Sequence, residues 1–129
     1  MDSNALLDVA TGDPAWSEWS AEALESAGEE DTFVINPILF AEVSTRYERI
    51  EELEEVVPVA LYRRESIPYA AAFLAGKRFV AYRRRGGSRL ASLPDFFIGA
   101  HAAVARYRLL TRDAARYRTY FPSVPLIAP

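Results

Sequence analysis

Hydrophobic positions along the chain alternate between short continuous runs and longer stretches with helical spacing. The short runs predict strands at residues 1–3, 32–35, 56–60, 109–111 and 124–127. Apolar residues three to four apart, often preceded by proline, predict helices at residues 4–9, 14–27, 37–50, 51–57, 68–85, 94–107 and 113–120. Asn4 and Asn36 are the expected caps of two of these helices. Strands separated by helices predict an α/β fold with a mostly parallel sheet covered on both faces.

Composition favours a single domain over residues 1–129, because half of the 129 residues are hydrophobic and no long linker separates them. No run of about 18 apolar residues is present, so no membrane span is expected. The N-terminus turns acidic at once, which argues against a secretory signal. The chain has no cysteine, which fits a reducing cytoplasm and leaves carboxylates and His101 as possible metal ligands.

The two halves of the chain carry opposite charge. Residues 1–65 contain 16 acidic and 4 basic residues, whereas residues 66–129 contain 2 acidic and 11 basic residues. A basic half suggests a polyanionic ligand or an acidic partner protein. Composition alone does not distinguish such a binding surface from two solvated faces whose charges differ by chance.

Four acids lie in apolar or strand-end surroundings, where an unpaired charge is costly: Asp2, Glu42, Asp95 and Asp113. Each also has a local explanation. Asp2 suits a turn at a frayed terminus, and Glu42 suits the edge of the stripe that contains Ile38. Asp95 in a first helical turn meets the helix dipole, and Asp113 suits an N-cap.

Together the four acids indicate a metal site. A parallel sheet gathers ligands at the carboxyl ends of its strands, and clustered carboxylates repel one another unless cations hold them. Oxygen ligands without sulfur or histidine favour Mg²⁺ or Mn²⁺. Pairs of such ions are used by enzymes that hydrolyse phosphodiesters. The basic half of the chain would then hold the substrate's phosphates. The pattern therefore predicts a metal-dependent nuclease.

Four segments in order, DSNALLDV, NPILFAEVS, LPDFFIGAHA and LLTRDAARYRTYFP, resemble the PIN-domain family and especially the VapC toxins of type II toxin–antitoxin pairs. The resemblance covers nearly the whole chain and implies a three-layer α/β/α fold with four to five short strands. It implies that Asp2, Glu42, Asp95 and Asp113 are the catalytic, metal-binding acids. It also implies that Ser3, Asn4 and Thr111 orient carboxylates or metal-bound water.

One departure concerns the first acid. Relatives usually place several apolar residues before it, whereas here Met1 directly precedes Asp2. Either the true start lies upstream, or the strand is unusually short and Asp2 is less firmly held.

The resemblance implies a cytoplasmic Mg²⁺- or Mn²⁺-dependent endoribonuclease toxin, which forms a homodimer and is neutralised by an antitoxin protein. The alternatives are a PIN nuclease that acts in RNA processing or on DNA, and a non-catalytic binding module. Arg112, beside Asp113, is the expected substrate contact. We expect Trp16 and Trp19 in the core and His101 as a packing residue.

Overall fold

The computed structural model describes residues 1–87 and 93–129, and it contains helices and short strands in an alternating order. The helices of the described residues are α1 (Ser3–Thr11), α2 (Ser17–Glu30), α3 (Pro37–Ser44), α4 (Ile50–Val56), α5 (Tyr69–Arg84), α6 (Leu93–Ala105) and α7 (Ala114–Tyr120). The strands are β1 (Phe33–Ile35), β2 (Tyr62–Arg64), β3 (Leu109–Leu110) and β4 (Leu126–Ile127). None of these helices is long and apolar enough to cross a membrane.

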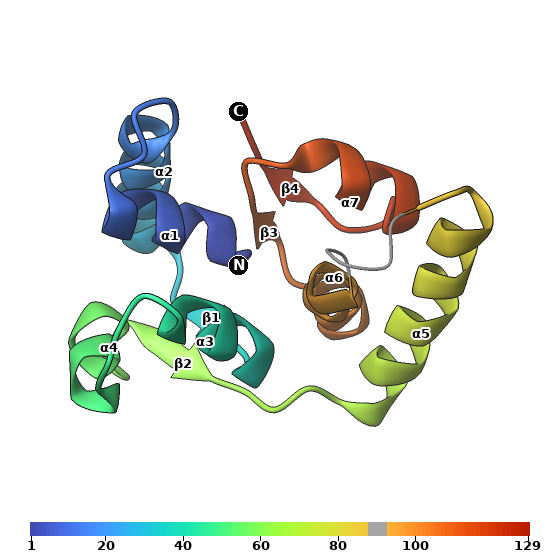
Figure 1. Ribbon diagram of the computed structural model, residues 1–129, viewed down its shortest axis with the longest axis horizontal. Helices are drawn as coiled ribbons and strands as arrows, with labels where there is room; N and C mark the ends of the chain where they lie inside the picture. Colours follow the sequence, from blue (N-terminus) through green and yellow to red (C-terminus); the bar gives the residue numbers. More distant parts are fainter. Residues whose placement is uncertain (88–92) are drawn as a thin grey trace.

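The strands pair in parallel, as predicted, but they form two separate pairs. Strand β1 pairs with β2, and β3 pairs with β4. The main-chain N of Met1 donates to Val34 of β1 at 3.4 Å, and that of Asp2 donates to Leu110 of β3 at 2.9 Å. The first two residues therefore lie between the pairs (Figure 1), at the position of a central strand. The short extended segment predicted at the N-terminus ends at Asp2, because Ser3 already begins α1.

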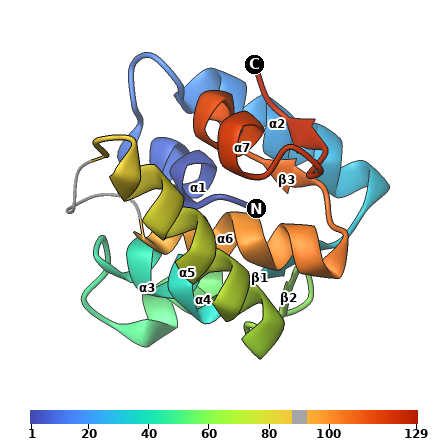
Figure 2. The same cartoon turned by 90° about the vertical axis from the view of Figure 1, so that its right-hand side faces the viewer.

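Helices flank the strand pairs on two sides. Figure 1 shows α1 and α2 to the left of β3 and β4 and α5 and α6 to the right, while α3 and α4 lie beside β1 and β2; Figure 2 shows α5 in front of α6. One apolar cluster packs α5, α6 and α7 together, and a second packs α1, β1, α3 and α4 together. Gly99 of α6 allows the first cluster to close, because a Cβ there would lie 2.5 Å from the ring of Phe121.

Three local predictions were wrong. The stretch 37–50 is not one helix: α3 ends at Ser44, and Ile50 begins α4. No strand lies at 56–60, where α4 ends and a turn follows, because the strand forms at Tyr62–Arg64 instead. Asn4 caps no helix, since Asp2 occupies the N-cap position of α1. Asn36, by contrast, caps α3 by accepting from Leu39 N at 3.0 Å, as predicted.

The two tryptophans do not lie in the core as expected. Trp16 and Trp19 are both half-buried at the start of α2, and their rings meet edge to face at 6.4 Å. The predicted start of this helix was also early, because Asp13 accepts from Ala15 N and Trp16 N and holds a turn before Ser17.

Candidate functional site

The four acids singled out by the sequence come together in one pocket of about 420 Å³, called here the acid pocket. Asp2 lies at the start of α1, Glu42 on α3, Asp95 in the first turn of α6, and Asp113 directly before α7. The full lining is Asp2, Ser3, Asn4, Leu7, Asp8, Thr11, Asp13, Glu42, Arg46, Asp95, Arg112 and Asp113. Residues 111 positions apart in the sequence thus face the same space.

Asp2 is held by three neutral donors. Its Oδ2 accepts from Asn4 Nδ2 at 3.0 Å, from Thr111 Oγ1 at 2.9 Å and from Tyr117 Oη at 2.9 Å. Asp2 is only 3% exposed. The pKa of Tyr117 lies well above its usual value, mainly because Tyr117 is buried and also because of the negative charge of Asp2. Asp2 is therefore firmly held, and the alternative of a frayed terminus is wrong.

Thr111 organises this side of the pocket although it does not line it. The hydroxyl is fully buried, donates to Asp2, and accepts from Asn4 Nδ2 at 3.2 Å and from Asp113 N at 3.0 Å. One donor and two acceptor positions are thus all used. The hydroxyl links the first acid to the last one.

Glu42 projects from α3 towards the start of α1. Ser3 Oγ donates to its Oε1 at 3.0 Å. Burial, followed by the charge of Asp2, raises the pKa of Glu42, while the Ser3 hydrogen bond opposes that rise. Ser3 therefore orients the carboxylate of Glu42, which is half-buried at the edge of the apolar stripe and lines the acid pocket.

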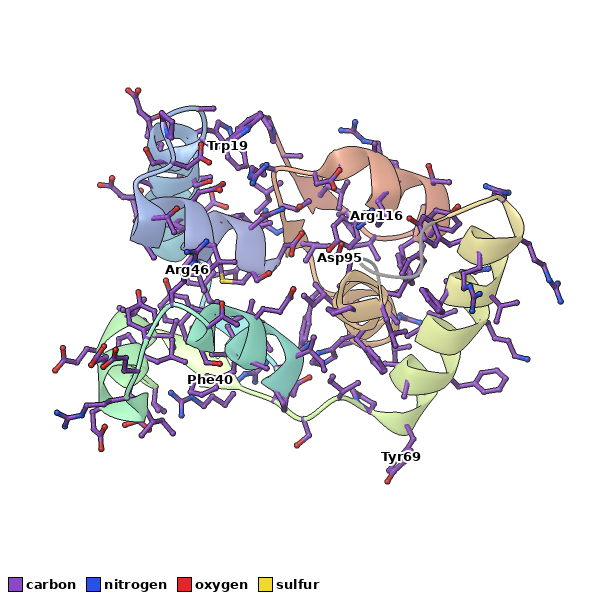
Figure 3. All side chains as sticks on the ribbon, in the orientation of Figure 1. Trp19, Phe40, Arg46, Tyr69, Asp95 and Arg116 are labelled. Atoms are coloured by element: carbon purple, nitrogen blue, oxygen red, sulfur yellow. The ribbon has the colours of Figure 1, made fainter. Side chains whose placement is uncertain are left out.

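Asp95 lies in different surroundings, because its partner is a cation. Arg116 of α7 donates to Asp95 Oδ2 and also lies 5.7 Å over the ring of Tyr82. Burial raises the pKa of Asp95 to about 7, the charges of Asp2 and Glu42 add to the rise, and Arg116 opposes it. Figure 3 shows Asp95 and Arg116 pointing towards each other. Sequence reasoning missed the pairing of Asp95 with Arg116, since nothing local connects positions 95 and 116.

Asp113 occupies the N-cap position of α7, but its side chain makes no capping hydrogen bond. The exposed carboxylate lines the acid pocket instead. The charge of Asp113, after that of Asp95, raises the pKa of Arg116 against the effect of burial. Capping therefore does not explain this acid.

Two arginines line the acid pocket beside the acids. Arg112 forms an ion pair with the buried Asp8 at 2.8 Å, and its guanidinium lies 5.6 Å over the ring of Trp16. Asp8 also accepts from Ser20 at 2.9 Å. Arg46, which sequence reasoning missed, follows α3 and is exposed at the pocket (Figure 3). The exposed guanidinium of Arg46 offers a second positive group beside the carboxylates.

The donor chemistry of the pocket fits a hard divalent cation. Carboxylate and hydroxyl oxygens are the ligands that Mg²⁺ and Mn²⁺ prefer. Burial and the charges of neighbouring carboxylates raise the pKa values of Glu42 and Asp95, and a bound cation would oppose both rises. In residues 1–87 and 93–129 as they are arranged, no three His, Cys, Asp or Glu side chains form a group that could hold a metal ion.

Comparisons with known proteins identify the family and the fold. A family model described as PIN domain matches residues 1–122. Among solved structures, a chain from the crystal structure of VapBC2 from Rickettsia felis bound to a DNA fragment from their promoter superposes with a TM-score of 0.70. The match covers 99% of this chain and 96% of that chain at 16% sequence identity. No curated protein matches the chain. The expected PIN-like α/β fold is thereby confirmed.

Proposed function

Because the chain belongs to the PIN-domain family, we propose that it is a metal-dependent endoribonuclease and the toxin of a type II toxin–antitoxin pair. The observation that carries the proposal is the convergence of Asp2, Glu42, Asp95 and Asp113 on one pocket from four separate segments. A partly buried cluster of carboxylates costs stability unless a cation joins it. Such a cost is typical of a functional site rather than of a structural one.

The four acids would hold one or two Mg²⁺ or Mn²⁺ ions. A bound ion of this class activates water and offsets charge that develops on phosphate oxygens. Asn4, Thr111 and Tyr117 fix the orientation of the Asp2 carboxylate, so this acid needs no rearrangement to bind. Ser3 does the same for Glu42.

Asp95 would exchange one positive partner for another. In the structure its carboxylate pairs with Arg116. A divalent ion brings a larger charge to the same oxygens, so Arg116 would move away from Asp95 when the ion binds. The guanidinium would then be available to a substrate phosphate, because arginine binds phosphate with several donors.

The RNA backbone would lie across the rim formed by Arg46 and Arg112. Both guanidinium groups line the pocket that contains the acids, and phosphate contacts of this kind position a nucleic acid without reading its sequence. Arg112 is anchored by Asp8 and Trp16, so its position is preorganised. Arg46 is exposed and has freedom to follow the strand.

The proposed partners follow from the family and from the fold neighbour, which was determined as a VapBC2 complex on promoter DNA. We propose that this chain likewise binds a small antitoxin protein, acts in the cytoplasm, and forms a homodimer. Growth of a bacterial host that expresses the chain alone, and then together with the protein encoded beside its gene, tests the toxin assignment. Growth arrest that is relieved by the protein encoded beside the gene supports the toxin assignment. Unaffected growth together with nuclease activity of the purified protein points to RNA processing instead.

The nuclease assignment is tested with purified protein and single-stranded RNA. We expect cleavage in the presence of Mn²⁺ or Mg²⁺, no cleavage with a chelator, and little cleavage of DNA of the same sequence. Asp95→Asn should lower the rate by about a hundredfold or more. Glu55→Gln, at an exposed acid of α4 outside the pocket, is the matched control. Equal rates for Asp95→Asn and wild type would refute the site.

A further inference from the structure

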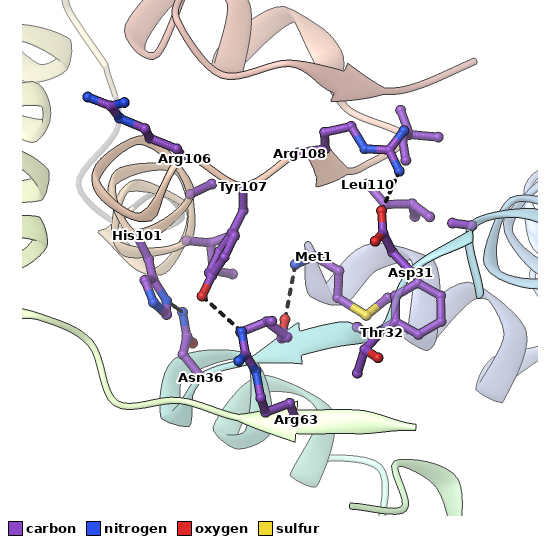
Figure 4. Close-up of a pocket in the computed structure, with 16 residues that line it drawn as sticks. Met1, Asp31, Thr32, Asn36, Arg63, His101, Arg106, Tyr107, Arg108 and Leu110 are labelled. Carbon is purple, nitrogen blue, oxygen red and sulfur yellow. Dashed lines mark hydrogen bonds and ion pairs between the residues drawn. The ribbon is translucent and has the colours of Figure 1, made fainter. Parts of the chain in front are cut away.

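A second buried polar cluster lies on the same two helices as two of the acids, at their other ends. Asn36, directly before α3, donates from Nδ2 to His101 Nδ1 of α6 at 3.1 Å. Both side chains are buried. They point towards each other beside a cavity of about 490 Å³ that does not contain the acids (Figure 4). An asparagine–histidine bond buried between two helices restricts how those helices move.

The spacing along both helices relates this contact to the acid pocket. Glu42 follows Asn36 by six residues, and His101 follows Asp95 by six residues. Six residues of helix rise about 9 Å. Helices α3 and α6 therefore meet at two places, through Asn36 and His101 at one and through the pocket that Glu42 and Asp95 share at the other.

The hydrogen bonds define which nitrogen of His101 carries the proton. Asn36 Oδ1 accepts from Leu39 N at 3.0 Å, so the NH₂ group of Asn36 faces His101. Because this NH₂ group can only donate, Nδ1 of His101 must be the acceptor. The proton is then on Nε2, which donates to Glu65 Oε1 at 2.9 Å. Glu65 Oε2 accepts from Tyr107 at 2.7 Å. These bonds give His101 one tautomer and one orientation.

From this geometry we propose that Asn36 and His101 form a tether that sets the position of Glu42 relative to Asp95. Asn36 has two tasks, because one end of its amide caps α3 and the other end holds α6. His101 is a positioning residue, not a catalytic one, and Glu65 and Tyr107 fix its ring. The consequence for the acid pocket rests on the proposed function, whereas the tether itself does not.

Substitutions at Asn36 separate capping from tethering. Serine is a good N-cap but is too short to reach His101, so Asn36→Ser keeps the cap and removes the tether. Aspartate also caps α3, but it presents an acceptor to His101 and would hold that ring doubly protonated between itself and Glu65. The charged groups around the ring are then Glu65, the new carboxylate and Arg63, which contacts both Tyr107 and Glu65.

Nuclear magnetic resonance of the full chain without metal tests the tether. In wild type we expect the ¹⁵N shifts of an unprotonated Nδ1 and a protonated Nε2 on His101. In Asn36→Ser, amide exchange at Leu39 should stay within about threefold of wild type, while the amide shifts at Glu42 and Asp95 change. Asn36→Asp should return those shifts towards wild type and protonate Nδ1. Unchanged shifts at Glu42 and Asp95 in Asn36→Ser, or a proton on Nδ1 in wild type, would overturn the proposal.

A Mn²⁺ titration of the same variants connects the tether to the site. We expect Asn36→Ser to weaken binding by about fivefold, below the 10- to 100-fold cost of losing a group that directly supports a ligand. Asn36→Asp should remain within about twofold of wild type. If wild type binds no Mn²⁺ and cleaves no RNA, the proposed function fails, and the amide shifts still decide whether the tether exists.

Discussion

Two walls of the acid pocket stabilise a carboxylate in different ways. The Asp2 wall consists of Asp2, Asn4, Thr111 and Tyr117, and it surrounds the charge with three neutral donors. The Asp95 wall consists of Asp95 and Arg116, and it opposes one charge with another. Neutral donors fix a carboxylate without removing its negative charge, whereas an arginine opposes that charge directly. Under the proposed function, the Asp2 wall is therefore arranged in advance, and the Asp95 wall would exchange its arginine for a metal ion.

The largest expected effect comes from removing the Asp2 carboxylate. Asp2→Ala leaves the hydroxyls of Thr111 and Tyr117 and the amide of Asn4 without their acceptor in a buried site, so unfolding free energy should fall by about 3 kcal/mol. Urea denaturation at neutral pH measures this loss. Cleavage should also disappear. A stable Asp2→Ala protein would show that the Asp2 wall contributes no structure.

The Asp95 wall should respond in the opposite direction. Its carboxyl has a pKa of about 7 in the folded chain against an ordinary value of 3.8. The folded state therefore binds more protons between these values, and its stability falls as pH rises from about 4 to about 7. Asp95→Asn removes this loss and should add about 1–2 kcal/mol at pH 8, after allowance for partial exposure.

Two controls sharpen the Asp95 result. At pH 4 the variant and wild type should differ little, since Asp95 is then protonated in the folded chain. Denaturation at both pH values in a chelating buffer provides the comparison. Equal destabilisation by Asp95→Asn at pH 4 and pH 8 would mean that the ion pair with Arg116, rather than the buried charge, dominates this wall.

The contrast between the walls also explains what the sequence revealed. Asp2, Asp95 and Asp113 were recognisable because each follows a strand or begins a helix, and Glu42 because it interrupts the apolar stripe of a helix. Side-chain capping explains neither Asn4 nor Asp113. A local pattern cannot show that Thr111 contacts Asn4, or that Asp113 shares a pocket with Asp2, because these partners lie at opposite ends of the chain. The pairing of Asp95 with Arg116 is likewise tertiary and has no local signal.

The missed elements have physical causes as well. Strand β2 reads YRR, with one buried and two exposed residues, so it has neither an apolar run nor enough length for alternation. The break between α3 and α4 contains no glycine or proline, so helical spacing continued across it in the prediction. The long helices were easier. Helix α5 packs Ala71, Leu74, Ala75, Phe79 and Tyr82 against the core at helical spacing, and α6 buries most of its apolar residues.

Ion binding should stabilise the wild-type chain by placing positive charge beside Asp95, which reduces the difference between the two walls. Mn²⁺ at about a hundred times its dissociation constant should add about 2–3 kcal/mol to unfolding at pH 7.5. The gain should shrink by at least half in Asp95→Asn, whose amide cannot supply the charge. Thermal denaturation with and without Mn²⁺, with Ca²⁺ and a chelator as controls, measures it. An equal gain in both proteins would place the ion away from Asp95.

A smaller effect is expected from removing the arginine. If Asp95 binds the metal ion as proposed, Arg116 competes with the ion, so Arg116→Met should tighten Mn²⁺ binding by about fivefold at pH 8.5. At pH 6.5 the gain should vanish, because without the guanidinium the pKa of Asp95 rises further and a proton takes the place of the ion. Calorimetric titration at the two pH values separates these cases. Weaker binding at pH 8.5 would show that Arg116 organises the wall instead of competing for it.

The smallest expected effect concerns the rim, which neither wall includes. Arg46→Ala should raise KM for a single-stranded RNA by about three- to fivefold and leave kcat unchanged, because an exposed guanidinium at the edge of the pocket binds a phosphate equally in the ground and transition states. The salt dependence of RNA binding should fall by about one unit of slope. Arg49→Ala, three residues away and paired with Glu51, is the matched control. If Arg46→Ala lowers kcat instead, the guanidinium acts on the reacting phosphate, and the catalytic surface extends beyond the two walls.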